Sequence, residues 1–420
     1  MPANPTRPRV SVVIPTYNRA ELLRETLQQL TRQSLGPDEF EVIVADDGSR
    51  DGTRAVVDSF SDRLRTGYHF QEDLGFRAGA ARNGGARLAS APILCFIDTG
   101  VLPGPDFLRS HLAQHADGVP AAVSGYAYGY NPDGYPLKEA GDLVGRLRPE
   151  EILARFGDSP DFRDVRHEHF AQCGFDLDSR AIPWNMFFTI NCSMPTDEFW
   201  AVGGFDESFV GWGAEDVELG FRLHRRGLTF RVTRPGWVIE WPHQRPDIAV
   251  LLEQLKTNFE RYVRRSPEPV MELGWALTGM DRPMFDWNDE YHKLNVWRCA
   301  ARDLSVAGEI EDALRHAPPG GRVAVVGCGG TLPRSPHDFI AMDFDRDLLA
   351  GALGDGRHPG YNSIGLRTPL PDRYADTVVF TSRMSGLWDR WGDDLLAEAA
   401  RIGTVVVRGQ PAVADSQRAR

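Results

Sequence analysis

Short runs of mostly apolar residues recur along the first hundred positions, and each is followed by a proline or an aspartate. Such runs occupy residues 10–14, 41–45 and 93–97. Apolar runs of this length, without regular polar alternation, are typical of strands buried on both faces of a parallel sheet. Residues 23–30, between the first two runs, carry leucines at helical spacing. The pattern predicts an α/β fold in which strands and helices alternate.

A second set of apolar runs begins beyond position 320, at residues 322–326, 339–342, 375–380 and 404–407. It predicts a second, smaller α/β unit of Rossmann-like type. Before it, residues 247–265 have helical spacing and an aromatic-rich passage follows, which predicts a packed helical connector. We therefore expect four segments: residues 1–245, residues 246–315, residues 316–410 and a tail of residues 411–420.

Composition is that of an ordinary globular protein and excludes some partners. The 420 residues, 42% of them hydrophobic, suffice for two domains. A formal net charge of −12 argues against nucleic acid or an anionic membrane surface as a main partner. Only three of the 47 basic residues are lysines (Lys138, Lys256 and Lys293), a bias that we associate with bacterial genes rich in G and C.

The location of the protein follows from what the sequence lacks. No apolar run approaches the length of a membrane span, and residues 1–7 hold no apolar signal core. The five cysteines are odd in number and scattered without metal-type pairing, which indicates reduced thiols. We expect a cytoplasmic protein with no membrane span.

Acidic residues follow two of the predicted strands. Asp46 and Asp47 directly follow residues 41–45, and Asp98 directly follows residues 93–97. Ligands of open α/β sheets bind outside the carboxyl ends of the strands, so both carboxylates should line one crevice. Between them, Arg82 lies in a glycine-rich stretch, and a guanidinium suits a diphosphate. Each piece alone could be a turn or a helix cap, but together they favour a nucleotide site.

The segment from Gly203 to Asp216 is the richest in candidate chemistry. It combines glycines, which admit close backbone approach, with Trp212, which offers a flat apolar face to a sugar ring. Glu215 and Asp216 then open a predicted helix. Acidic residues at a helix start are often explained by the helix dipole alone. The glycines and the tryptophan favour instead a carboxylate that takes a proton from an attacking hydroxyl.

Five pieces, in this order along the chain, carry a resemblance to a known family. They are Val-Ile-Pro-Thr-Tyr-Asn (13–18), Ala-Asp-Asp-Gly-Ser (45–49), Ala-Arg-Asn-Gly-Gly (81–85), Phe-Ile-Asp-Thr-Gly (96–100) and the block 203–216. The first 245 residues resemble family 2 of the inverting glycosyltransferases, which have the nucleotide-sugar-binding GT-A fold. The last block is similar to that of chondroitin-polymerase-like and β-1,4-galactosyltransferase-like enzymes.

The resemblance implies roles for individual residues on the donor side. Pro15, Tyr17 and Asp47 would hold the base and ribose of a nucleotide, expected to be uridine. Arg82 would contact the pyrophosphate or the base. Asp98 would bind the ribose and a diphosphate-bound metal ion.

On the acceptor side, the resemblance implies that Asp216 is the general base. Glu215 would contact the acceptor sugar, and Trp212 would pack against the acceptor or donor ring. The reaction implied is transfer of a sugar from a nucleotide-sugar to a hydroxyl of a saccharide or small-molecule acceptor, with inversion.

The resemblance also implies a divalent metal, Mn²⁺ or Mg²⁺, held by Asp98 and by His243. One position departs from the family pattern, because Gly100 stands where the second aspartate of Asp-x-Asp is the usual metal ligand. An ion with one carboxylate, one imidazole, phosphate oxygens and water is chemically feasible. The alternative is a loop histidine without a ligand, so metal dependence stays open.

The C-terminal unit weakly resembles the core of class I S-adenosylmethionine-dependent methyltransferases. There Gly327 and Gly329 would approach the cofactor and Asp343 would take its ribose hydroxyls. Because no acid precedes the glycine turn and the unit is short, we favour a packing, docking or dimerisation role, with a homodimer formed through this domain.

Three alternatives to a glycosyltransferase with that single activity follow from the sequence. A bifunctional glycosyltransferase and methyltransferase would bind S-adenosylmethionine, and a non-catalytic nucleotide-sugar scaffold would show no turnover. A sugar nucleotidyltransferase would need a Gly-x-Gly-Thr-Arg loop, where this chain has Pro-Thr-Tyr-Asn at residues 15–18. Glycan and secondary-metabolite biosynthesis are both open as pathways.

Overall fold

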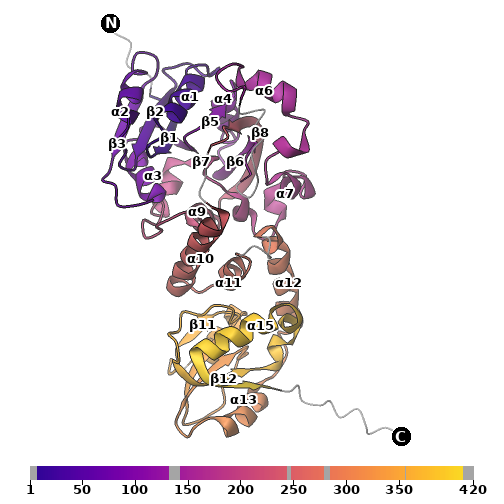
Figure 1. Cartoon of the computed structure of the whole chain (residues 1–420). Helices are drawn as coiled ribbons and strands as arrows, with labels where there is room; N and C mark the ends of the chain where they lie inside the picture. Colours follow the sequence, from indigo (N-terminus) through magenta and orange to yellow (C-terminus); the bar gives the residue numbers. More distant parts are fainter. Residues whose placement is uncertain (1–6, 132–141, 244–246, 279–283, 355, 410–420) are drawn as a thin grey trace. The chain divides into compact units, whose positions relative to one another are not determined.

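The computed structural model describes residues 7–131, 142–243, 247–278, 284–354 and 356–409 (Figure 1). The chain forms two compact units, Met1–Leu255 and Lys256–Arg420. Each contains its own sheet flanked by helices, which confirms the predicted α/β fold class. The finer division of the second unit into a connector and a terminal domain stays a prediction. In the described ranges, no helix is long and apolar enough to cross a membrane.

The first unit is built on an eight-stranded mixed sheet. Its strands lie in the order β3 (Thr66–Phe70), β2 (Phe40–Asp46), β1 (Val10–Thr16), β4 (Ile93–Ile97), β7 (Asn191–Pro195), β6 (Ala121–Tyr128), β8 (Thr229–Glu240) and β5 (Val101–Pro103). The first four strands are parallel, β7 is antiparallel to both its neighbours, and β6 runs parallel to β8. Three of the predicted apolar runs are therefore the neighbouring strands β2, β1 and β4.

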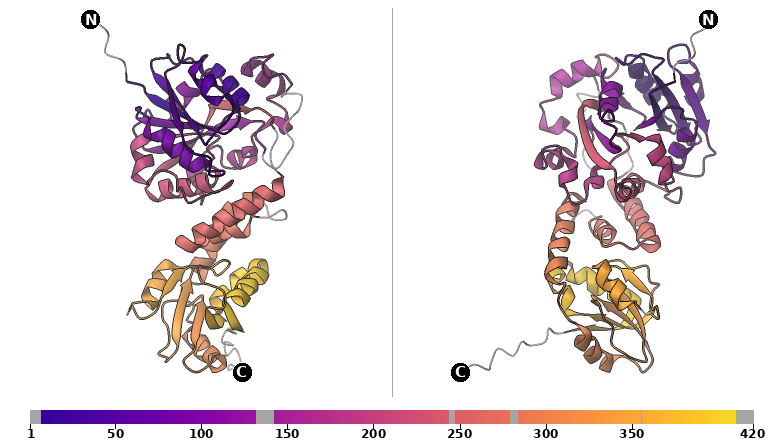
Figure 2. Two further views of the ribbon diagram at one scale, coloured as in Figure 1. Left: turned by 60° about the vertical axis from the view of Figure 1, so that its left-hand side comes forward. Right: turned by 180° about the vertical axis from the view of Figure 1, so that it is seen from behind.

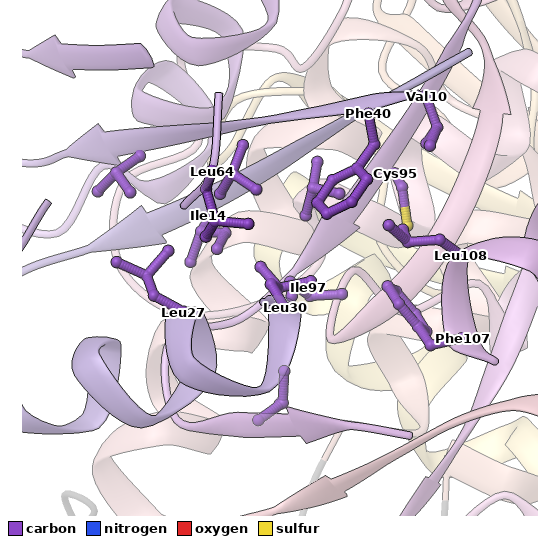
Figure 3. Close-up of a cluster of buried hydrophobic side chains, with 14 of the residues drawn as sticks. Val10, Ile14, Leu27, Leu30, Phe40, Leu64, Cys95, Ile97, Phe107 and Leu108 are labelled. Carbon is purple, nitrogen blue, oxygen red and sulfur yellow. The ribbon is translucent and has the colours of Figure 1, made fainter. Parts of the chain in front are cut away.

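Helices cover both faces of the parallel part, which explains why its strands do not alternate. Val10 and Ile14 of β1 pack with Leu27 and Leu30 of α1 in one core cluster (Figure 3). On the opposite face, a Cβ at Gly85 in α3 would lie 2.8 Å from Val13 Cγ1, so glycine lets α3 approach the strand closely. The helices of this unit are α1 (Ala20–Leu30), α2 (Thr53–Asp58), α3 (Ala78–Arg87), α4 (Phe107–Ala113), α6 (Pro149–Phe156), α7 (His167–Gln172), α8 (Thr196–Ala201) and α9 (Glu215–Arg225).

Helix α10 (Ile248–Arg265) continues the chain from the first unit into the second as one unbroken helix (Figure 2). Within the second unit, Trp287 is fully buried, packs against the ring of Phe259 and donates its indole N–H to the Val270 carbonyl. The aromatic-rich passage therefore contributes core here, since such a ring is buried with its polar atom satisfied.

The second unit has a five-stranded, all-parallel sheet. Its order is β11 (Gly360–Asn362), β10 (Asp338–Asp343), β9 (Arg322–Val326), β12 (Ala375–Phe380) and β13 (Gly403–Arg408). Its helices are α11 (Pro269–Ala276), α12 (Trp287–Ala300), α13 (Ala307–Ala313), α14 (Arg346–Ala352) and α15 (Ser385–Ile402). The strand order reverses between β9 and β12, the position where open α/β sheets usually bind ligands.

Candidate active site

Two adjacent aspartates at the end of β2 have different roles. Asp46 accepts hydrogen bonds from the backbone N–H groups of Gly48 and Ser49 and from the Tyr68 hydroxyl. It therefore shapes the turn, as a turn-forming aspartate does. Asp47 is buried, and its backbone N–H donates to the Thr16 carbonyl at 2.9 Å, which joins the ends of β1 and β2. The structure thus separates a scaffold aspartate from a candidate binding aspartate.

The Asp47 carboxylate holds both ends of the segment 71–77. One oxygen accepts from the Gln71 side-chain amide at 2.5 Å and the other from the Arg77 backbone N–H at 2.8 Å. Burial raises the pKa of Asp47, and the two hydrogen bonds act against that rise. Each carboxylate oxygen can accept more than one hydrogen bond, so Asp47 can also accept a hydrogen bond from a ring N–H group of a nucleotide base.

The other donor-side candidates lie at the end of β1. Tyr17 is 45% exposed and donates its hydroxyl to Asp73 at 2.9 Å. Pro15 is half-buried and its carbonyl accepts from the Thr99 hydroxyl at 2.8 Å, which ties this strand end to the loop after Asp98. An exposed phenol ring beside a strand end is a suitable stacking surface for a base.

Arg82 connects the two halves of the site. It projects from α3, is only 4% exposed, and donates to Asp98 at 2.9 Å and to Glu215 at 3.0 Å. Its guanidinium also lies over the Phe205 ring, 5.5 Å from the centroid. Asp98, which is the candidate nucleotide-binding carboxylate, and Glu215 at the start of α9 are therefore joined through one buried positive charge.

Asn83, which the sequence analysis did not single out as a site residue, fixes the glycine-rich block. Its side chain accepts from the Phe205 backbone N–H and donates to the Phe205 carbonyl, both at 2.9 Å. Gly204 has φ +70°, and a Cβ there would lie 2.6 Å from the Asn83 side-chain oxygen. A signal was present, because asparagine is disfavoured inside a helix unless its amide has a specific partner.

The start of α9 holds the candidate base. Asp216 is half-buried, and its carboxylate accepts from the Val217 N–H at 2.8 Å and from the Thr189 N–H at 3.3 Å. Burial first, and the neighbouring Glu215 carboxylate second, raise the pKa of Asp216 to about 7, while Arg82 lowers it. Thr189 is a second contributor that the sequence analysis did not name. The helix-capping interpretation accounts for one of the two bonds to Asp216.

Glu215 behaves differently from an ordinary capping residue. It is 8% exposed, one oxygen pairs with Arg82, and the other oxygen is buried without a hydrogen-bond partner. The preceding residue, Ala214, has φ +73°, a strained conformation for a residue with a Cβ. Backbone strain of this kind concentrates at functional sites.

Trp212 lies half-buried between two glycines with positive φ. Its backbone N–H donates to the Gln254 side chain at 2.8 Å, and a Cβ at Gly213 would lie 2.7 Å from a Leu255 methyl. The backbone that directly precedes the acidic start of α9 is therefore packed against α10.

The residues expected to hold a metal lie on adjoining segments. β5, directly after Gly100, pairs with the end of β8, and the Trp241 N–H donates to the Gly100 carbonyl at 2.9 Å. The His243 ring has Nδ1 3.0 Å from the Trp241 carbonyl and Nε2 3.1 Å from an Arg19 guanidinium nitrogen. Nδ1 must then carry the proton, which leaves the Nε2 lone pair directed at Arg19 or at an ion.

Asp98 and His243 are a sparse donor set. The Asp98 side chain is 40% exposed with one oxygen paired to Arg82, and no group of three acidic, histidine or cysteine side chains suited to an ion occurs in the described residues. One carboxylate and one imidazole fit an ion that takes its other ligands from phosphate and water. Gly100 has φ +95°, so an aspartate at this position would be strained.

The glycine turn of the second unit is filled by the protein itself. A Cβ at Gly327 would lie 2.8 Å from the Thr381 hydroxyl, and one at Gly329 would lie 3.5 Å from Arg383 Cδ. Asp343 has no exposed side-chain surface and forms two hydrogen bonds of 2.9 Å with Arg383. This geometry does not favour a cofactor at the three residues that the methyltransferase resemblance singled out.

A cavity of about 240 Å³ does exist in the second unit, away from that turn. Its walls include Glu268, Tyr291, Arg298, Arg346 and Asn362, and neither glycine of the turn nor Asp343 lines it.

Comparisons with known proteins agree with the arrangement of the first unit. Glycosyl transferase family 2 matches residues 11–191, and the N-terminal domain of galactosyltransferase matches residues 169–244. Two validoxylamine A glucosyltransferases, from Streptomyces hygroscopicus subsp. limoneus and subsp. jinggangensis, are each 47% identical over 411 residues. These alignments cover 95% of this chain and 90% and 96% of the relatives. A chondroitin synthase from Escherichia coli is 33% identical over 53% of this chain and 33% of its own.

Solved structures are more distant. The S. aureus TarS 1–349 structure in complex with UDP is 18% identical, with a TM-score of 0.42 and coverage of 60% of this chain and 65% of that one. The mannosyltransferase PcManGT from Pyrobaculum calidifontis, in complex with GDP-Man and Mn²⁺, is 20% identical, with a TM-score of 0.44 and coverage of 74% and 81%.

Proposed function

Because this chain belongs to the glycosyltransferases of family 2, we propose that it transfers glucose from UDP-glucose to a hydroxyl of an acceptor of the validoxylamine type. The likeness to two validoxylamine A glucosyltransferases over nearly the whole chain supports the sugar and the acceptor class. The observation that carries the chemistry is the buried Arg82, which links the candidate donor carboxylate Asp98 to the acidic start of α9.

In the proposed reaction, Asp216 removes the proton of the acceptor hydroxyl as its oxygen attacks the anomeric carbon. The bond from that carbon to the diphosphate breaks on the opposite side, so the anomeric centre inverts in a single step. A raised pKa suits this role, because a base works best when its pKa is near the working pH. The Val217 and Thr189 N–H groups orient the carboxylate.

The donor would lie along the ends of β1, β2 and β4. We assign the base and ribose to Pro15, Tyr17 and Asp47, and the side of the crevice nearest the diphosphate to Asp98. A divalent ion held by Asp98 and His243 would neutralise charge on the leaving diphosphate when bound. Arg82, through its ion pair with Asp98, contributes positive charge next to the side of the crevice that we assign to the diphosphate.

The acceptor would lie against the start of α9. Trp212 offers an apolar face to a ring, and the unpartnered Glu215 oxygen can accept a hydrogen bond from a hydroxyl or an ammonium group. An amine-containing acceptor suits this acidic site electrostatically, since Glu215 and Asp216 are adjacent. The homodimer and the cytoplasmic location stay predictions.

A direct assay tests the proposal. Purified protein is incubated with UDP-, GDP- or dTDP-glucose and validoxylamine A, with Mn²⁺ or with EDTA, and products are identified by mass spectrometry and NMR. We expect a monoglucosylated product with a β linkage formed from UDP-glucose, and turnover lower by on the order of 10²-fold or more with Asp216→Asn. Nucleotide-sugar binding without any transfer to this acceptor would contradict the acceptor assignment, and an α-linked product would contradict inversion.

A further inference from the structure

Arg82 is enclosed to an unusual degree for an arginine at a nucleotide crevice. It is 4% exposed, and both terminal guanidinium nitrogens are engaged by carboxylates, one to Asp98 and one to Glu215. Its third nitrogen, Nε, is buried without a partner. A phosphate-binding arginine normally directs its planar fork at the ligand. Here both ends of that fork are bound by carboxylates of the protein itself.

The two carboxylates come from parts of the chain far apart in sequence. Asp98 follows β4, and Glu215 is the first residue of α9. The guanidinium is planar and rigid, so two carboxylates bound to its two terminal nitrogens lie at a fixed separation. A single side chain therefore sets the distance between the donor side and the acceptor side of the crevice.

The part of α3 that carries Arg82 is held firmly against the segment around Phe205. The next residue, Asn83, binds the Phe205 backbone through both its amide atoms, and Arg82 lies over the Phe205 ring. A Cβ at Gly79, in the first turn of α3, would lie 3.3 Å from Phe205 Cβ. Helix α3 is thus held closely against the block that precedes α9, and an outward swing of the Arg82 side chain would break its two ion pairs and its contact with the Phe205 ring.

Glu215 supplies an independent observation that points to a ligand. The residue is 8% exposed, yet one carboxylate oxygen has no hydrogen-bond partner. Burying an unpaired acceptor is costly, and such groups are normally satisfied by protein, water or ligand. With one oxygen fixed by Arg82, the other is held in place to receive a donor.

We propose that Arg82 is a positioning residue that aligns the donor and acceptor subsites by holding Asp98 and Glu215 on one guanidinium, and that it is not a diphosphate ligand. The inference rests on the proposed function and deepens it. Glu215, fixed by Arg82, accepts a hydrogen bond from the acceptor. Asp98 is kept at the donor side with its second oxygen exposed to the crevice.

The test compares Arg82→Lys, which keeps one charge and loses the fork, with Arg9→Lys, a control in an exposed pair with Glu39. Calorimetry gives the Kd for UDP, and steady-state kinetics give kcat and the acceptor KM. We expect a UDP Kd within about threefold of wild type, and a kcat lower by on the order of 10²-fold because the two subsites lose alignment. If the UDP affinity of Arg82→Lys fell together with its kcat while the acceptor KM stayed unchanged, the proposal would be overturned.

A double-mutant cycle guards against simple loss of folding. Arg82→Gln leaves Glu215 buried without its charge partner, whereas Arg82→Gln with Glu215→Gln removes both charges of that pair. If Arg82 acts through Glu215, the acceptor KM of the double variant matches that of Glu215→Gln alone. Additive effects on the acceptor KM would mean independent roles and would overturn the proposal.

The outcomes separate this inference from the proposed function. If the wild-type protein binds UDP but transfers nothing to the chosen acceptor, the proposed function fails. The UDP affinity of Arg82→Lys then still decides between the two roles of Arg82, since an unchanged Kd supports the positioning role and a weakened one refutes it.

Discussion

In each unit, a buried arginine pairs with an aspartate at the carboxyl end of a strand, Arg82 with Asp98 and Arg383 with Asp343, but the two pairs differ in what else surrounds them. In the second unit, Arg383 and Asp343 are both fully enclosed and bind each other through two hydrogen bonds. Arg383 also donates to the Ala301 carbonyl, and Asp343 also accepts from the backbone N–H groups of Gly329 and Asp345. Donors and acceptors are matched within the protein.

In the first unit, the corresponding set is not matched. Arg82 binds two carboxylates, but Asp98 is 40% exposed and one Glu215 oxygen has no partner. In this protein, a strand-end acid therefore indicates a ligand site only where acceptor capacity is left over. A closed pair at the same place in an α/β sheet is a structural element.

The largest effect should follow from breaking the closed pair. Arg383→Met leaves Asp343 buried without its partner, which typically costs about 3–5 kcal/mol. Urea denaturation followed by circular dichroism should show early unfolding of the second unit. Arg302→Met, which removes an exposed pair with Asp347, is the matched control and should change stability by less than about 1 kcal/mol. Equal stability of the two variants would refute the structural role of Arg383.

Next in size is removal of the candidate base from the open site. Asp216→Asn keeps the shape but cannot accept a proton, so kcat should fall by on the order of 10²-fold or more. UDP affinity, measured by calorimetry, should stay close to that of wild type. A variant with wild-type turnover would show that another group is the base.

The fold and much of the candidate site could be predicted from the sequence because they depend on local patterns. Apolar runs identified β1, β2 and β4, and parallel strands bring Asp47 and Asp98 to one edge. What could not be predicted was pairing across long separations. Arg383 lies 40 residues from Asp343, and no periodicity indicates that it occupies the space of the glycine turn.

The same limit applies to a buried charge pair in the first unit that the sequence did not indicate. Asp164 and Arg166 form a fully buried pair, and Arg166 also donates to the carbonyls of Gly125 and Met186. Nothing in a charged, irregular stretch distinguishes such a pair from surface residues, because burial depends on the strands and helices that surround it. The positions of charged residues in the sequence alone therefore do not show which of them form buried ion pairs.

The pH dependence of turnover gives a smaller but more specific effect. Asp216 must be ionised to accept a proton, and burial with Glu215 raises its pKa to about 7. kcat/KM should therefore be constant at high pH and fall about tenfold per pH unit below that pKa. Measurement between pH 5 and 9, with buffer controls, checks this. A flat profile from pH 5 to 8 would mean that the Asp216 pKa is not raised or that chemistry does not limit the rate.

The smallest effect should come from the metal. With one carboxylate and one imidazole, Asp98 and His243 should bind an ion weakly without nucleotide, so EDTA should weaken UDP binding by only about tenfold or less. Gly100→Asp should not tighten it, because φ +95° is unfavourable for aspartate. Calorimetry with and without Mn²⁺ measures both. Strongly tightened, Mn²⁺-dependent binding by Gly100→Asp would contradict this explanation of the missing ligand.

Titration of the full-length protein with UDP and, separately, with S-adenosylmethionine in a calorimeter distinguishes the open site of the first unit from the closed site of the second. We expect saturable UDP binding and no heat of binding for S-adenosylmethionine, because Arg383 fills the glycine turn of the second unit. Binding of S-adenosylmethionine without binding of UDP would contradict this expectation, since the second unit would then hold the active site.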